Sequence, residues 1–187
     1  MKVVLFYHCL FVIGNDALES AGSIVGSQMA ELNRCGLLDA ASEMHVGVNG
    51  GDESKAVAEA VLPSQAKVTY HGLQCRNELR TLLLLEKWLA QSDEEAYILY
   101  FHAKGATHRI NTREWNRRLL WRECMMRHLV SNWRQCVQDL HNVESVGCHW
   151  MQPPATPAGQ YIWAGNFWWA RASFLRTLPS LMERDRI

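Results

Sequence analysis

The chain has 187 residues, of which 48% are hydrophobic and 20% are charged, and its 19 basic side chains balance its 19 acidic ones. This length suits one domain with its own core, and the composition excludes a disordered tail, a collagen and a strongly charged binder. The balance hides a segregated distribution: residues 1–103 carry 7 basic and 13 acidic side chains, whereas residues 104–134 carry 8 basic and 2 acidic ones.

The cysteines and the apolar start of the chain indicate in which cellular compartment the protein is expected. The six cysteines include no Cys-x-x-Cys pair, which predicts free thiols in a reducing compartment. Residues 3–13 are apolar, but Tyr7, His8 and Cys9 interrupt the run and no A-x-A cleavage site follows. We therefore interpret this run as a buried strand rather than a signal peptide. No stretch reaches roughly 18 consecutive apolar residues, so we expect a soluble cytoplasmic protein without a transmembrane segment.

The first half of the chain alternates apolar runs with helical periodicity. The run 3–13 is typical of a strand covered on both faces, as in parallel sheets. The predicted strands that follow are residues 44–48, 66–70 and 96–102. Two helices are predicted. The first spans residues 24–35 and ends before Gly36, and the second spans residues 77–90.

The second half begins with a basic helix. Asn111 is its predicted N-cap because Glu114 follows three residues later, and an apolar stripe runs from Trp115 to Trp133. Residues 143–150 and 167–170 are predicted strands, and a short helix starts at Ser173. This alternation indicates an α/β three-layer sandwich with a mostly parallel sheet, and the absence of repeats or linkers indicates a single domain over residues 1–187.

The nucleotide-binding motifs of common α/β enzymes are missing. No GxGxxG follows the first strand, and no GxxxxGK[ST] or GxSxG occurs. This disfavours dinucleotide oxidoreductases, P-loop enzymes and hydrolases with a nucleophile elbow. The histidines and cysteines lack the paired spacings of a structural zinc site.

The loop His102-Ala103-Lys104-Gly105 is the sharpest local signal. Ligands of open α/β sheets bind at the carboxyl ends of strands, and this loop follows the clearest strand of the chain. The ammonium of Lys104 would stand at the mouth of the crevice, where a point charge suits a phosphate oxygen. The alternative is a surface lysine in a turn.

The Trp-rich segment 163–169 has two interpretations. Alternation along a strand sends Phe167 and Trp169 to one face and Trp168 to the other, so part of the segment must be core. A functional interpretation places Asn166 and a tryptophan at a sugar, since aromatic faces stack on apolar sugar faces.

Three motifs together resemble the nucleotide-sugar glycosyltransferases of the GT-A fold. They are Arg76-Asn77 at the start of a helix, the strand 96–102 with its polar end, and GNFWWA at residues 165–170. YFHAKG at residues 100–105 and GNFWWA are similar in particular to a bacterial and viral subgroup from surface-polysaccharide loci. Weaker similarity at residues 35–41 and 46–50 extends the resemblance over nearly the whole chain.

The resemblance implies a Rossmann-like GT-A fold and an enzyme of polysaccharide biosynthesis. Such a glycosyltransferase moves a hexosyl or deoxyhexosyl group from a nucleotide-diphosphate donor to a glycan, a lipid-linked acceptor or another hydroxyl. Carried over residue by residue, the catalytic positions are His102 and Lys104. The donor positions are Tyr7, His8, Asn49, Arg76, Asn77, Glu78, Thr81 and Gly105, and the sugar or acceptor positions are Trp163, Asn166 and Trp168.

The chain departs from that family in two places. His102-Ala103-Lys104 replaces the metal-binding Asp-x-Asp, so we expect Lys104 to stabilise the leaving diphosphate, with Mn²⁺ or Mg²⁺ as an open alternative. After Trp169 the only candidates for a catalytic base are Glu183 and Asp185, so we expect a truncated member, with a catalytically inactive sugar-nucleotide binder as alternative.

A rival hypothesis from another class is a nucleic-acid-binding module. The basic helix 109–134 would contact phosphates and its tryptophans would stack on bases. The acidic first half of the chain would oppose a polyanion, and no nucleic-acid partner is expected.

Overall fold

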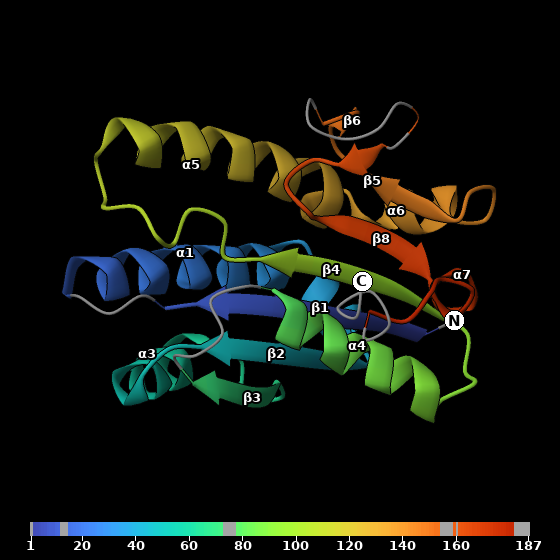
Figure 1. Ribbon diagram of the computed structural model, residues 1–187, viewed down its shortest axis with the longest axis horizontal. Helices are drawn as coiled ribbons and strands as arrows, with labels where there is room; N and C mark the ends of the chain where they lie inside the picture. Colours follow the sequence, from blue (N-terminus) through green and yellow to red (C-terminus); the bar gives the residue numbers. More distant parts are fainter. Residues whose placement is uncertain (1, 12–14, 73–77, 154–158, 160, 182–187) are drawn as a thin grey trace.

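A computed structural model describes residues 2–11, 15–72, 78–153, 159 and 161–181, and all structural statements concern these residues. Its main sheet has six strands in the order β3-β2-β1-β4-β8-β5 (Figure 1). The strands of this sheet are β1 (Lys2–Leu10), β2 (Glu43–Asn49), β3 (Lys67–Gly72), β4 (Ala96–His102), β5 (Ser145–Gly147) and β8 (Trp168–Arg171). A separate hairpin pairs β6 (Trp150–Met151) with β7 (Ile162–Trp163).

The strand directions confirm a mostly parallel sheet. Strands β3, β2, β1 and β4 are parallel to one another, while β8 is antiparallel to both β4 and β5. Strands β1 and β4 are buried along almost their whole length, which explains why their sequences are continuous apolar runs. The predicted α/β sandwich is therefore confirmed.

Helices cover both faces of the sheet. The helices are α1 (Asn15–Arg34), α2 (Leu37–Ala40), α3 (Asp52–Val61), α4 (Leu79–Gln91), α5 (Arg113–Met125), α6 (Trp133–Asp139) and α7 (Ala172–Arg176). Helices α1 and α5 share one core with Leu5, Tyr7 and Phe101, whereas α4 and α7 pack on the opposite face against Phe6 and Tyr100. Figure 1 shows α4 crossing in front of β1, on the side of the sheet away from α1.

The basic helix begins one residue later than predicted and contains a π-helical turn. Its N-cap is Thr112, whose hydroxyl accepts a hydrogen bond from the Trp115 N–H at 3.2 Å. Asn111 instead adopts a left-handed conformation with φ 64°. After α5 the chain forms the π segment η1 (Met126–Ser131) before α6. The predicted apolar stripe is confirmed at its two ends, since Trp115 and Trp133 are buried.

Several other predicted boundaries are wrong. Helix α1 starts at Asn15 rather than at residue 24, and α3 was not predicted. The single strand predicted over residues 143–150 is divided between β5 and β6, with His149 between them at φ 55°. The five described cysteines are free, and Cys75 lies outside the described residues. Within the described segments, no helix combines the length and the apolar character that crossing a membrane requires.

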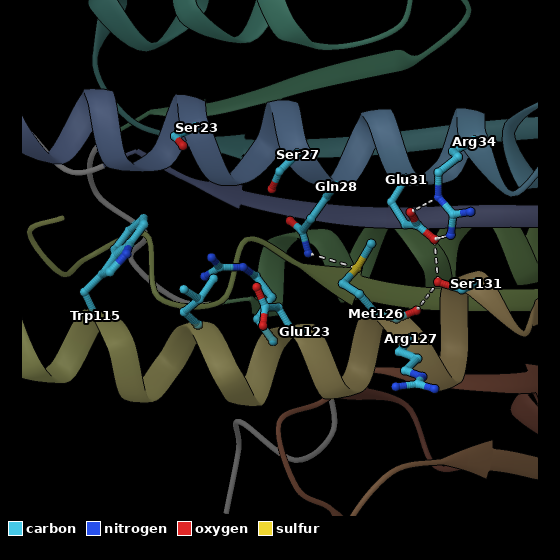
Figure 2. A pocket seen from close by; sticks show the side chains of 12 residues that line it. Ser23, Ser27, Gln28, Glu31, Arg34, Trp115, Glu123, Met126, Arg127 and Ser131 are labelled. Carbon is cyan, nitrogen blue, oxygen red and sulfur yellow. Dashed lines mark hydrogen bonds and ion pairs between the residues drawn. The ribbon is translucent and has the colours of Figure 1, made fainter. Parts of the chain in front are cut away.

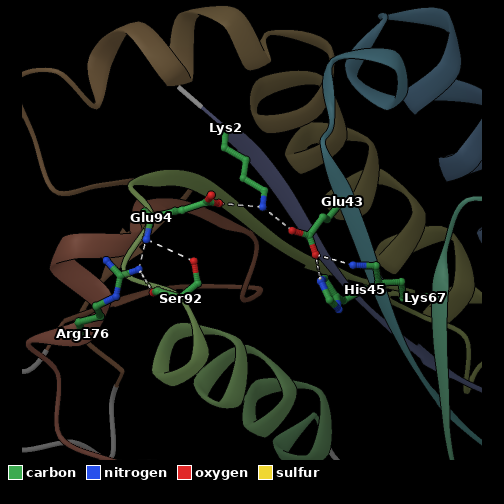
Figure 3. A network of polar contacts seen from close by, with 7 residues as sticks. All are labelled: Lys2, Glu43, His45, Lys67, Ser92, Glu94 and Arg176. Atoms are coloured by element: carbon green, nitrogen blue, oxygen red, sulfur yellow. Dashed lines mark hydrogen bonds and ion pairs between the residues drawn. The ribbon is translucent and has the colours of Figure 1, made fainter.

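A network of ion pairs joins the amino-terminal ends of the parallel strands (Figure 3). Lys2 Nζ lies 2.5 Å from Glu43 Oε1 and 3.0 Å from Glu94 Oε2. Lys67 and His45 contact the other oxygen of Glu43, at 2.7 and 3.0 Å. This edge of the sheet is therefore tied together by charge, at the end opposite to the one where ligands of such sheets bind.

Candidate functional site

The carboxyl ends of β1 and β4 form the switch point of the sheet. From β1 the chain builds β2 and β3 on one side, and it then crosses to place β4 on the other side of β1. Crevices at such points are the usual ligand sites of open α/β sheets. His8 and His102 are register partners there. A cleft of about 700 Å³ opens beside them, and its lining residues are His8, Leu10, Glu78, Leu79, Leu82, His102, Ala103, Lys104, Gly105, Ala106, Thr107, His108 and Arg118.

His8 is held at the floor of the cleft by α4 and β2. Its Nδ1 lies 2.8 Å from Thr81 Oγ1, and both side chains are buried. The register partner of His8 on β2 is Gly47, and a Cβ on Gly47 would stand only 2.0 Å from Thr81 Oγ1. The missing side chain of Gly47 therefore makes room for the Thr81 hydroxyl.

Burial keeps the His8 imidazole neutral at pH 7. Its pKa is lowered to about 4, mainly by burial; the charge of Glu78 opposes this shift, and the neighbouring His102 and His71 add to it. The floor of the cleft is thus a neutral hydrogen-bonding group rather than a cation.

His102 has a defined tautomer. Its Nε2 lies 2.8 Å from the carbonyl oxygen of Gly165, and because a carbonyl can only accept, Nε2 carries the proton. Burial lowers the pKa of His102, and nearby Lys104 adds to this shift. The ring is therefore neutral at pH 7, and its Nδ1 is unprotonated.

Glu78 is fixed by groups from two other elements. Its Oε2 accepts hydrogen bonds from Asn166 Nδ2 at 2.5 Å and from the Tyr100 hydroxyl at 2.9 Å. Asn166 adopts φ 55°, and its Oδ1 accepts a hydrogen bond from Trp168 Nε1 at 2.9 Å. Trp168 in turn stacks on Tyr100, with ring centroids 5.3 Å apart. The start of α4, strand β4 and the GNFWWA segment thus form one connected wall.

Two cations share the other wall of the cleft. Lys104 Nζ lies 4.2 Å from the centre of the Trp121 ring, and burial together with the charge of Arg118 lowers the pKa of Lys104. The Nε of Arg118 is buried and has no hydrogen-bond partner among the described residues. Like charges side by side are unfavourable unless an anion lies between them, so this wall is suited to bind one.

The cleft unites some of the predicted site residues and leaves others apart. His8, Glu78, His102, Lys104 and Gly105 line it, while Thr81 and Asn166 hold lining residues from behind. The remaining described positions lie elsewhere: Tyr7 is buried on the opposite face, Asn49 is buried at the end of β2, Trp163 packs on Trp150, and Trp168 lines a hollow under α4 and α7. Arg76, Asn77, Glu183 and Asp185 lie outside the described residues.

Two titratable residues of the cleft, His108 and Arg118, were not predicted from the sequence. Arg118 belongs to the basic stretch that the charge count singles out, but its direction depends on how α5 packs over the loop after β4. Lys104 lies over the Trp121 ring, and Arg118 lies 5.6 Å from the centre of the same ring. The i, i+3 spacing of Arg118 and Trp121 is the sequence signal that could have pointed to this cluster.

The described residues around the cleft do not suit a divalent metal. Within the described part of the chain, no group of three or more His, Cys, Asp or Glu side chains is placed to hold a metal ion. Where the glycosyltransferase resemblance expects Asp-x-Asp, the chain has His102 and Lys104, and Glu78 Oε2 already accepts two hydrogen bonds.

The hypothesis of nucleic-acid binding requires exposed tryptophans on the basic helix. Trp115 and Trp133 are 7% and 9% exposed, so neither offers a face on which a nucleic-acid base could stack.

Comparisons with known proteins place the chain in a family. No curated protein matches the sequence. Among solved structures, "Crystal structure of 4-diphosphocytidyl-2C-methyl-D-erythritol synthase" is similar with 14% sequence identity, covering 90% of this chain and 71% of that one, with a TM-score of 0.40. A family profile described as "Domain of unknown function (DUF8361)" matches residues 6–185, so the chain belongs to this family.

Proposed function

We propose that the protein is a glycosyltransferase that binds a nucleotide-diphosphate sugar in the switch-point cleft and transfers the sugar to a glycan or other hydroxyl acceptor. The observation that carries this proposal is the wall formed by Lys104 and Arg118 beside the neutral imidazoles of His8 and His102. Two cations above a neutral floor suit a diphosphate, and the cleft of about 700 Å³ lies within the range of small-molecule sites.

The proposed roles follow from the chemistry of each side chain. The bond from the sugar carbon to the diphosphate oxygen breaks, the bond to the acceptor oxygen forms, and the acceptor hydroxyl loses its proton. Lys104 and Arg118 offset the charge that develops on the leaving diphosphate, which is the task a metal performs in other transferases. His102 offers its unprotonated Nδ1 as the acceptor of this proton. Tyr100 and Asn166 both contact Oε2 of Glu78, so its Oε1 is left to accept a hydrogen bond from the nucleotide sugar.

The donor is identified by a thermal-shift screen of UDP-, GDP-, dTDP- and CMP-sugars, each with and without Mn²⁺. We expect one diphosphate donor to raise the Tm by about 5–10 °C at a concentration 100 times its Kd, with no further effect of Mn²⁺. Lys104→Ala should abolish the shift, whereas Lys87→Ala on the exposed face of α4 should leave it unchanged.

Three results would count against parts of the proposal. Absence of a shift with every nucleotide sugar would refute the donor site, and stabilisation by the CMP-sugar alone would refute the diphosphate. Full turnover by Lys104→Ala would refute its role toward the leaving group. Binding without release of the nucleoside diphosphate would instead support the alternative of a catalytically inactive sugar-nucleotide binder.

A further inference from the structure

The loop that carries His102 and Lys104 is anchored from the opposite face of the sheet. Gln28 of α1 donates from Nε2 to the carbonyl oxygen of His102 at 3.2 Å. Arg122 of α5 donates from Nη1 to the carbonyl oxygen of Lys104 at 2.7 Å. Both side chains line a pocket of about 440 Å³ between α1 and α5, where Figure 2 shows Gln28 reaching from α1 toward α5.

Arg122 is a buried cation that forms no ion pair with the side chains that the structure describes. Arg122 is only 4% exposed, and no carboxylate oxygen of the described side chains lies within 4.0 Å of its guanidinium. The Arg122 guanidinium also lies over the Trp115 ring, whose centre is 5.4 Å away. Burial lowers the pKa of Arg122, which reflects the cost of removing this charge from water. A position so costly for folding suggests a role beyond packing.

The turn after Lys104 lies directly against the same helix. Gly105 has φ 93°, and a Cβ at this position would stand 3.1 Å from Arg118 Cβ and 3.2 Å from Arg122 Nη1. Arg118 and Arg122 are separated by one helical turn, so α5 supplies one arginine to the cleft wall and the next to the backbone of the loop. The two arginines thus hold the turn between them.

We propose that Arg122 is a positioning residue for Lys104. By holding the Lys104 carbonyl from behind the sheet, it fixes the backbone from which the ammonium reaches the diphosphate. This inference rests on the proposed function for its consequence in binding, but the anchoring itself can be measured without any ligand.

The test compares Arg122→Ala with Arg122→Lys, and uses Arg127→Ala as a matched control. Arg127 lines the same pocket and is exposed. Calorimetric titration with UDP, GDP and dTDP should show about 10-fold weaker binding of the preferred nucleotide in Arg122→Ala, the loss expected for one charged hydrogen bond. Arg122→Lys keeps a donor and should retain most of the affinity, and Arg127→Ala should match the unaltered protein.

Two further readouts separate positioning from general stability. Amide hydrogen exchange over residues 102–108 should accelerate in Arg122→Ala while exchange in β1 does not change. Because the pocket borders Arg122, millimolar guanidinium chloride should restore nucleotide affinity to Arg122→Ala and have no effect on Lys104→Ala. If Arg122→Ala does not fold, Arg122→Gln, which keeps amide donors without the charge, is measured in the same way.

The outcomes distinguish this inference from the proposed function. Unchanged exchange over residues 102–108 and unchanged nucleotide affinity in a folded Arg122→Ala or Arg122→Gln would overturn the positioning role. Failure of the unaltered protein to bind any of the three nucleotides would overturn the donor site alone, since accelerated exchange of the loop would still support the anchoring.

Discussion

At the scale of single residues, His8 links the cleft to the pH dependence of stability. Its ordinary pKa of 6.5 applies to the unfolded chain, whereas burial lowers the pKa to about 4 in the folded protein. Between these values the unfolded chain binds a proton that the folded protein does not, so folding becomes less favourable as pH falls. The contribution of His8 is complete above pH 6.5 and is lost by about pH 4, and it amounts to about 3 kcal/mol.

His8→Asn should therefore reduce the loss of stability on acidification. Urea unfolding at pH 7.5 and pH 4.5 should show a difference in the free energy of unfolding that is smaller by about 2 kcal/mol in the variant. The exposed His128 provides the control His128→Asn. An equal acid-induced loss in His8→Asn and the unaltered protein would rule out this account.

Two pairs of nearby residues show how much of the site could be predicted from the sequence. Lys104 was predicted to face a ligand because it follows a buried strand, and the family resemblance assigned His102 at the end of that strand to the same site; both line the cleft. Tyr7 and His8 were both assigned to the nucleotide, but consecutive side chains of a strand point to opposite faces. Only His8 faces the cleft, and the Tyr7 hydroxyl donates to Gln28 on the other face at 2.5 Å. Alternation alone could have separated these two.

At the scale of elements, the contact between β2 and α4 depends on a glycine, Gly47, at a position where no side chain fits. A Cβ on Gly47 would lie 2.0 Å from Thr81 Oγ1 and 3.0 Å from His71 Nε2. We expect Gly47→Ala to push α4 outward, to break the contact between Thr81 and His8, and to cost about 2–3 kcal/mol of stability.

Chemical denaturation measures this cost, and nucleotide affinity reports the effect on the cleft. Gly26→Ala is the matched control, because a Cβ at Gly26 of α1 would meet no atom within 4 Å. Equal stability of Gly47→Ala and the unaltered protein would show that α4 is not held as closely as described.

The elements that sequence reasoning located well are those with a single strong signal. Strand β4 matches its predicted range of residues 96–102 because an unbroken apolar run is buried on both faces. Helix α3 was missed because four of its ten residues are charged and all its apolar residues are alanine or valine. The place of β8 between β4 and β5 is a matter of long-range pairing, which local periodicity does not encode.

At the scale of the whole molecule, the two ends of the parallel strands have different roles. The carboxyl ends form the cleft, and the amino ends are joined by the ion pairs around Glu43 (Figure 3). Although burial alone would raise it, hydrogen bonds from Lys2, Lys67 and His45 lower the pKa of Glu43 to about 2. Stability from Glu43 is therefore present above its ordinary pKa of 4.5 and is lost as the pH falls toward 2.

Glu43→Gln should separate stability from binding. We expect it to lower the free energy of unfolding at pH 7 by about 2 kcal/mol, since it leaves two ammonium groups without their shared partner. Nucleotide affinity should not change, because the cleft lies at the opposite end of the strands. Exposed Glu59→Gln on α3 is the control, and a loss of affinity in Glu43→Gln would contradict the separation.

The position of β8 also has a consequence for how the protein is made. This strand comes late in the chain but lies inside the sheet, between β4 and β5. The segment just before it supplies the Gly165 carbonyl to His102 and the Asn166 amide to Glu78. During synthesis the four parallel strands emerge before β8 does, because all four precede it in the chain. The cleft therefore acquires its final shape only after residues 165–171 have docked against β4, because the Gly165 carbonyl and the Asn166 amide then reach His102 and Glu78.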